Sequence, residues 1–323
     1  MTTVLPWQPG QAPYVTPDQL YTASASGGAS QWPTGVQWGS LPSTGATPEQ
    51  QAAVLAMLCQ QGTTRAEEIC NQPLRATIAT EELQGPHFRV TVQWHSKNGR
   101  IITSRWPVLQ VLSVEVCANA SWPRVFNPLP AGFFEPEFPV PGLYGTSVAA
   151  GAGEGAQSII CAPGYINWML GRNGWRVRFK YLAGWPHTTL TAAATAGADT
   201  IQVDDCTGWA PLTTGTPGAY GIVYDAMSGG QETVSCTAAT AQSGPGTLTL
   251  ASPLNYGHAA GIMVSSMPQN AIWATALLTG RAAMQRGATA TTVQTLGGRS
   301  QKATPGGLHA VACDLLHGFR RTE

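Results

Sequence analysis

The sequence predicts an α+β fold, with a helical-bundle core that carries β-strands and an inserted small all-β barrel or sandwich domain. Three observations lead to this prediction. Apolar residues recur at helical spacing in three segments, they alternate at strand spacing after the first of these, and short strands separated by turn signals follow. We expect an extended N-terminal arm over residues 1–46, a core made of residues 47–187 and 268–323, and the inserted domain over residues 188–267.

The N-terminal arm is rich in Pro, Gly and Ser and sustains no period. It also contains aromatic residues, which a disordered tail would lack. We therefore expect the arm to dock on its own subunit or on a neighbour. These aromatic residues are Trp7, Tyr14, Tyr21, Trp32 and Trp38.

The first helix is predicted over Thr47–Asn71. Its opening residue can act as the N-cap, Pro48 suits the first helical position, and Gln50 completes a capping box. Gly62 lies in the middle of this helix and is expected to weaken it, because glycine is a poor helix former.

Alternating apolar and polar residues predict β-strands after this helix. Arg89–Trp94 and Ile101–Trp106 flank the dipeptide Asn98-Gly99, which is a strong sequence signal for a hairpin turn. An irregular, proline-rich connection is expected over residues 117–156. Further strands are predicted over Pro107–Val116, Ser158–Met169 and Gly174–Trp185.

The inserted domain is expected to contain about five short strands. Turn signals at Pro217-Gly218 and Ser243–Gly246 separate them. The predicted strands are Thr200–Val203, Gly221–Asp225, Glu232–Thr237, Thr247–Leu250 and Gly261–Ser265.

Two more helices are predicted towards the C-terminus, separated by a linker over residues 288–303. The first begins near Pro268 and stops at Gly287, and Thr304-Pro305 opens the second. The apolar stripe of the last helix fits core packing up to Ala312. From Leu315 onward the tail extends beyond the partners expected within the subunit, so we expect it to contact another molecule.

Composition favours an assembled protein and a bland monomer about equally. Charged residues make up only 11% of the chain, the net charge is zero, and interface cores are depleted of charge. The seven cysteines are odd in number and lack paired spacing, which is typical of a reducing compartment and argues against a zinc site. We expect no signal peptide, no membrane span and no nucleic-acid-binding patch.

Four groups of residues are candidates for chemistry, and the sequence favours a structural role for each of them. Gly151–Ala156 fits a loose dinucleotide pattern without the required strand and helix around it. The acidic residues Asp204, Asp205, Asp225 and Glu232 lack a metal-binding pattern, and Asp205 is expected to cap the turn at Thr207-Gly208. His258 is interpreted as a hydrogen-bonding residue in a turn. Arg176, Arg178 and Lys180 are interpreted as the solvated face of a strand. We therefore expect no enzyme activity, cofactor or metal.

Five phrases of the sequence, in their order along the chain, carry a resemblance to a known family. They are Cys70–Thr77, Trp106–Val114, Arg176–Pro186, Pro268–Ile272 and Leu315–Arg321. Over roughly residues 47–187 and 268–323 the chain resembles the head–tail connector (adaptor) proteins of tailed bacteriophages. The inserted domain is similar to small β domains of phage structural proteins, in the phrases Thr200–Asp205 and Gly257–Gly261.

The resemblance implies a virion structural protein of the neck, assembled in the cytoplasm of a bacterial host. Such proteins form a dodecameric homo-oligomer ring, a helical bundle with a β element, that connects the portal protein to a stopper or tail-completion protein. Genomic DNA passes the lumen without sequence-specific binding, and no membrane is expected. The arm, the loop over residues 117–156 and the inserted β domain depart from the compact family members, and we expect them to decorate the outside of the ring or to contact capsid or tail proteins. The C-terminal segment docks into the portal. The expected portal-interface residues are Leu308, Leu315, Leu316, Phe319, Arg320 and Arg321. Removing residues 315–323 is then expected to leave a folded protein that no longer joins portal-bearing heads.

Two alternatives stay open from the sequence. One is a tail-associated protein that binds or hydrolyses carbohydrate with its β domain, where Trp209 and Tyr220 would stack on sugars and the acidic residues would act as catalysts. The other is a cytosolic enzyme built on the loop at Gly151–Ala156.

Overall fold

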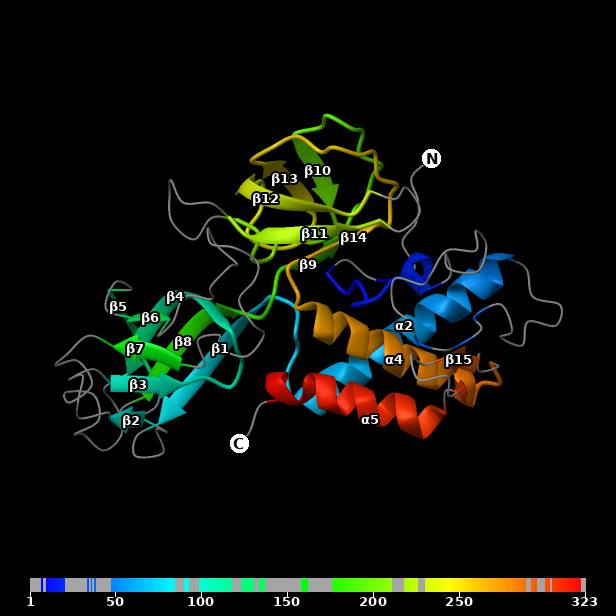
Figure 1. Cartoon of the computed structure of the whole chain (residues 1–323). Coiled ribbons are helices and arrows are strands. Elements are labelled where there is room, and N and C mark those ends of the chain that lie inside the picture. The colour runs from blue at the N-terminus through cyan, green and yellow to red at the C-terminus, as the bar shows by residue number, and fades with distance from the viewer. Residues whose placement is uncertain are drawn as a thin grey trace.

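The computed structural model describes residues 7, 10–20, 34, 36, 38, 48–84, 90–92, 99–117, 123–130, 134–136, 158–161, 176–210, 218–225, 230–288, 292–294, 300–302 and 304–320 (Figure 1). In this view a six-stranded half-barrel lies at the top, the helices α2, α4 and α5 lie at the lower right, and two four-stranded sheets lie at the lower left. An N-terminal segment, drawn in blue, runs between the half-barrel and the helices.

The predicted fold class is wrong, because the described fold is mostly β and has no helical-bundle core of the expected kind. Antiparallel strands form a six-stranded sheet, two four-stranded sheets and a two-stranded ladder, and helices make up fewer of the elements. The helices are long and have clear periodic patterns in the sequence, so a prediction from the sequence gives them too much weight. The strands are short, and many of them pair with segments far away in the chain. Their share of the fold is therefore evident only from the structure.

Each predicted helix is confirmed within a few residues. The helices are α2 (Pro48–Cys70), α4 (Gln269–Gln285) and α5 (Pro305–Leu316), and α5 continues into the short 3-10 helix η3 (His317–Phe319). The side chain of Thr304 caps α5 by accepting a hydrogen bond from the Gly307 amide. Helix α4 lies in the middle and packs against both α2 and α5, and most of its residues are buried.

Helix α2 is continuous through Gly62. A Cβ atom at Gly62 would overlap the Thr279 hydroxyl and would lie 3.0 Å from the Thr275 carbonyl oxygen in α4. Glycine is therefore required here because the two helices approach closely. Thr275 and Thr279 are fully buried and donate their hydroxyl groups to carbonyl oxygens one turn earlier in α4.

The two four-stranded sheets at the lower left share a core of their own. One sheet has the order β1-β8-β4-β5, with β1 at Thr77–Gln84, β8 at Arg176–Ala183, β4 at Val108–Cys117 and β5 at Asn127–Leu129. The other has the order β2-β3-β7-β6, with β2 at Val90–Val92, β3 at Gly99–Ile102, β7 at Ser158–Cys161 and β6 at Phe134–Pro136. The predicted hairpin is confirmed by the antiparallel pairing of β2 with β3, and its turn lies outside the described residues.

The half-barrel contains the five strands that the sequence predicts, and a sixth joins them. Its order is β10-β13-β12-β11-β14-β9. The strands are β9 (His187–Thr189), β10 (Thr200–Val203), β11 (Tyr220–Tyr224), β12 (Glu232–Ala239), β13 (Gly246–Leu250) and β14 (Met263–Ser265). The sheet curls so far that Leu190, directly after β9, forms a bridge with Val203 in β10 at the opposite edge.

The segment predicted as a linker over residues 288–303 contains regular structure. Strands β15 (Thr292–Gln294) and β16 (Ser300–Lys302) pair antiparallel in it. Two buried apolar cores organise the rest of the described chain. One runs without a break from the half-barrel into the helices, and the other lies between the four-stranded sheets. The half-barrel and the helices therefore share one core.

The contact between Gly62 and Thr279 predicts a specific loss of stability. We expect Gly62→Ala to lower the free energy of unfolding by about 1–3 kcal/mol, because the added methyl group overpacks the α2–α4 contact. Urea unfolding measures this difference. The matched control is Gly306→Ala in α5, where nothing lies within 4 Å of the new Cβ and helix propensity alone predicts a small gain. Equal stability of Gly62→Ala and the wild type would contradict the assigned contact.

Candidate functional site

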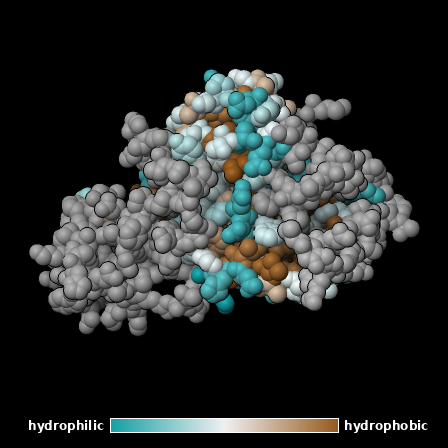
Figure 2. Space-filling model, in the orientation of Figure 1, coloured by the Kyte–Doolittle hydropathy of each residue, from teal (hydrophilic) through white to brown (hydrophobic). Residues whose placement is uncertain are grey.

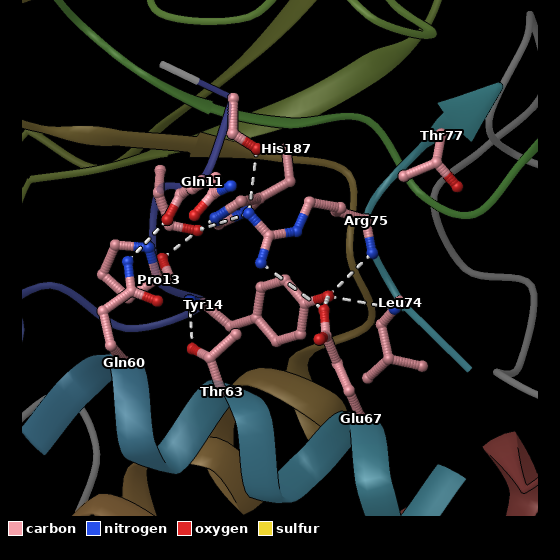
Figure 3. A network of polar contacts seen from close by, with 12 residues as sticks. Gln11, Pro13, Tyr14, Gln60, Thr63, Glu67, Leu74, Arg75, Thr77 and His187 are labelled. Atoms are coloured by element: carbon pink, nitrogen blue, oxygen red, sulfur yellow. Dashed lines mark hydrogen bonds and ion pairs between the residues drawn. The ribbon is translucent and has the colours of Figure 1, made fainter. Parts of the chain in front are cut away.

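The most connected polar site of the described chain lies where residues 10–20, here called the strap, pass between α2 and the half-barrel (Figure 3). Tyr14 of the strap is fully buried there. Its amide donates to the Thr63 hydroxyl in α2 at 2.9 Å, and the Gln60 side chain donates to the Gln11 carbonyl oxygen at 2.6 Å. The sequence left open whether the arm docks on its own subunit or on a neighbour. Tyr14 and Trp38 are buried within this subunit and Trp7 is partly buried, whereas Tyr21 and Trp32 lie outside the described residues.

The Tyr14 hydroxyl group joins the strap to the chain that leaves α2. It donates to the Glu67 carboxylate and accepts hydrogen bonds from the amides of Leu74 and Arg75, each at 3.0 Å. The Arg75 guanidinium lies 5.3 Å from the centre of the Tyr14 ring and 3.5 Å from Glu67 Oε1, and it donates to the Gly10 carbonyl oxygen at 2.9 Å. Figure 3 shows these groups pointing toward one another from the strap, α2 and the segment before β1.

The electrostatics of this site suit a structural role. Burial, and then the charge of Glu67, raise the pKa of Tyr14 well above its ordinary value, so the phenol stays neutral. Burial alone would lower the pKa of Arg75, but Tyr14 and Glu67 raise it. A neutral phenol and a charged Arg75–Glu67 pair satisfy one another here.

His187 ties the strap to the half-barrel. Its Nε2 lies 3.0 Å from the Pro13 carbonyl oxygen and its Nδ1 lies 3.0 Å from the Ser265 hydroxyl, which fits a neutral ring that donates from Nε2. Burial, and then the charge of Arg75, lower the pKa of His187 to about 3. A serine next to a histidine is also the arrangement of a nucleophile and its base. Here both side chains are buried and Ser265 Oγ also accepts the Met267 amide, so the pair is structural.

The acidic residues of the half-barrel are engaged in internal contacts. Asp204 Oδ2 accepts the Gly10 amide of the strap at 2.9 Å. Asp205 Oδ1 accepts the amides of Thr207 and Gly244 at 3.0 and 2.9 Å, which confirms its predicted role in capping this turn. These contacts leave no support for a catalytic acidic pair at Asp204 and Asp205.

His258 is not the isolated turn residue that the sequence suggests. Its ring lies between Asp225 at the end of β11 and Glu232 at the start of β12, with N–O distances of 2.9 and 2.8 Å. The two carboxylates contact different ring nitrogens, so they do not converge on one position for a metal. Residues 26 and 33 positions apart in the sequence make these contacts, and no motif spacing marks them.

The predicted portal-interface residues divide into a buried set and an exposed one. Leu308, Leu316 and Phe319 are buried, and Leu315 is partly buried. Arg320 is exposed, and Arg321 lies outside the described residues. The expectation that the tail from Leu315 onward lacks partners within the subunit is therefore wrong.

Phe319 anchors the tail in an aromatic cluster. Its ring stacks on Trp106 at a centroid distance of 6.4 Å and meets Trp185 edge to face at 5.5 Å. The side chain of Gln72 donates to the Phe319 carbonyl oxygen at 3.1 Å and accepts the Trp106 amide at 2.9 Å. The end of α2, the start of β4 and the end of β8 therefore hold the last described turn in place.

The basic strand β8 has the solvated face that the sequence predicts. Val177, Phe179 and Tyr181 point into the core, whereas the alternate basic residues point away from it. Arg176 and Arg178 pair with Glu82 at 2.8 and 3.5 Å. Arg178 also pairs with Glu115 at 3.4 Å, so carboxylates of the same sheet engage both arginines, which does not support a nucleic-acid platform.

The sequence also proposes Gly151–Ala156 and Trp209 as candidates. Gly151–Ala156 lies outside the described residues. Trp209 is fully buried, so it does not present a ring to a sugar. Within the described ranges, no group of three or more histidine, cysteine, aspartate or glutamate side chains is arranged to hold a metal ion. In those same ranges, no helix has the length and apolar character needed to cross a membrane.

Comparisons with known proteins found no relative of this chain. No family model, no curated protein and no solved structure matches this chain.

The lowered pKa of His187 predicts a loss of stability in acid. The folded state keeps the ring neutral down to about pH 3, whereas the unfolded chain binds a proton near the ordinary pKa of 6.5. Stability from this residue is therefore present above pH 6.5 and falls as the pH drops towards 3, by at most about 1.4 kcal/mol per pH unit. The free energies of unfolding of the wild type and of His187→Gln, measured from pH 7 to pH 3, should become more similar as the pH falls, because only the wild type loses the contribution of a neutral His187.

A ring titration by NMR provides the control for this prediction, because it needs no variant. It should show His187 neutral at mildly acidic pH. Protonation of His187 near pH 6.5 in the folded protein would contradict the assignment.

Proposed function

We propose that this chain is a non-enzymatic structural protein of a tailed-phage particle that acts as an adaptor in the neck, between the portal and the next joining component. The proposal rests first on the resemblance carried by the five sequence phrases. Its helical-bundle expectation is wrong for this chain, so the proposal concerns the role and makes no claim about a shared fold.

The observation that carries the proposal is the convergence of those phrases in space. Gln72, Trp106, Trp185 and Phe319 belong to four of them, and they meet in the aromatic cluster. Residues that lie far apart in the sequence thus build one junction, from which the basic end of the chain emerges at the exposed Arg320. A fixed junction with an exposed end is suited to docking on a partner.

The outward face of α5 also favours an assembled protein. Its exposed residues carry a single formal charge, at Asp314, and Val311 is 44% exposed. Figure 2 shows hydrophobic side chains gathered where α4 and α5 lie in Figure 1. Weakly charged apolar surface of this kind suits the contact between ring subunits, and a dodecamer is the number that the resemblance implies.

The carbohydrate hypothesis has less support. Trp209 is buried, and the carboxylates of Asp225 and Glu232 are occupied by His258 in the interior. Of the two residues expected to stack on sugars, Tyr220 is partly exposed and Trp209 is not, and the pair Asp225 and Glu232 is buried.

Two truncations test the proposal. A chain that ends at Phe319 keeps the buried anchors and should stay folded, but it should lose binding to the portal because it lacks Arg320 and Arg321. A chain that ends at Asp314 also loses Leu316 and Phe319, and burial of residues of this size contributes about 2–5 kcal/mol each. We therefore expect it to unfold, which corrects the expectation from the sequence alone.

Measuring the particle mass in solution, with and without the portal protein of the same particle, shows both whether this chain forms a homo-oligomer and whether it binds the portal. The wild type should form a ring-sized homo-oligomer or join one on the portal. Binding of the Phe319-ended chain that equals the wild type would reject the docking role of the basic end. If the wild type stays monomeric and does not bind the portal protein, the adaptor proposal is rejected.

A further inference from the structure

Helix α5 carries a histidine and a cysteine side by side on one of its faces. His309 and Cys313 are four residues apart, and side chains at this spacing are neighbours on a helix. Cys313 Sγ lies 3.7 Å from His309 Nε2 and 3.8 Å from His309 Nδ1. Thiolate sulfur and imidazole nitrogen are ligands that zinc prefers in proteins, and pairs of zinc ligands on a helix use this same spacing.

The separation of the two side chains fits a shared metal ion. Zinc binds thiolate sulfur at about 2.3 Å and imidazole nitrogen at about 2.0–2.1 Å, in tetrahedral geometry. From these bond lengths and the tetrahedral angle, a sulfur and a nitrogen that bind one zinc ion lie about 3.6 Å apart. The observed 3.7 Å between Cys313 Sγ and His309 Nε2 is close to this value. Rotation of the His309 ring about its bond to Cβ then aims a nitrogen lone pair at the shared position.

Both side chains of the pair are within reach of solvent. Cys313 is partly exposed, whereas the other cysteines that the structure describes are buried. His309 is partly exposed as well, whereas His187 and His258 are buried and contact polar groups of the half-barrel. Among the described thiols, Cys313 is therefore the one that a cation can reach from solution.

The surroundings of His309 keep its ring in the form that binds a metal. Burial, and then the charges of Arg281 and Arg65, lower the pKa of His309 below its ordinary value. A neutral imidazole offers a nitrogen lone pair, whereas an imidazolium has none. The two arginines also repel a divalent cation, and the negative charge of a metal-bound thiolate offsets part of this repulsion.

The sequence argues against zinc because no two cysteines have paired spacing. That argument does not cover one histidine and one cysteine on the same helix face. Two protein ligands do not close a tetrahedral site, so two of the four positions are left for water. Such an open site differs from the closed structural sites that cysteine pairs build.

We propose that His309 and Cys313 form a binding site for a divalent cation of the zinc type, with water in the two remaining positions. On binding, the Cys313 thiol releases its proton to solvent, and the sulfur and the His309 nitrogen each donate a lone pair to the ion. Hard cations such as Mg²⁺ prefer oxygen ligands and do not compete for this pair. The site is independent of the proposed adaptor role.

Titration of the full, reduced and metal-free chain with Co²⁺, a spectroscopic substitute for Zn²⁺, tests the site. One equivalent should bind and give the absorption of a thiolate–cobalt bond, which Zn²⁺ should remove and Mg²⁺ should leave unchanged. Cys313→Ser should abolish this absorption. His309→Asn should weaken binding by about tenfold or more, because loss of even an outer contact to a metal ligand costs that much. No thiolate absorption in the wild type, or the same absorption in Cys313→Ser, overturns the proposal.

His317→Asn is the matched control, because His317 is exposed and lies one turn beyond Cys313. This variant should bind Co²⁺ as the wild type does. Zn²⁺ should raise the thermal unfolding midpoint of the wild type and of His317→Asn, but not that of Cys313→Ser, and the same unfolding curves show whether each variant is folded. Binding that is lost in His317→Asn and kept in His309→Asn would reject His309 as the ligand.

Discussion

The buried hydroxyl group of Tyr14 fixes the relative positions of three parts of this chain. It donates to the Glu67 carboxylate of α2 and accepts two backbone amides at the entry to β1. The preceding strap residue, Pro13, accepts a hydrogen bond from His187 at the start of the half-barrel. Each buried donor left without a partner would cost about 1–3 kcal/mol. The helices and the half-barrel share one apolar core, and this polar junction joins the strap to both of them.

Local signals in the sequence predict where most helices and strands lie, but they do not predict how these elements are arranged in space. Thr304 and Pro305 mark the start of α5 because capping is decided within one turn, and alternating residues mark β8 because its two faces meet different surroundings. The sequence does not reveal the fold class, because strand pairing joins segments such as β1 and β8, which lie far apart in the chain. The requirement for glycine at Gly62 depends on Thr279 in another helix, so no local rule reveals it.

The candidate sites were hidden for the same reason. Tyr14 and Arg75 are 61 residues apart, and His258 meets partners from β11 and β12. Histidine next to serine, and histidine between carboxylates, are arrangements that enzymes use. Burial turns both into internal braces here, because no substrate reaches His187 or His258. Buried polar groups that form hydrogen bonds within the chain stabilise a fixed structure, which agrees with the structural role that we propose.

The position of this chain in an electron-microscopy map of the intact particle tests that role most directly. Our account predicts a ring of density between the portal and the next neck component, with α5 and the end of the chain facing the portal. Density at the tail tip, or the absence of the chain from purified particles, would contradict it.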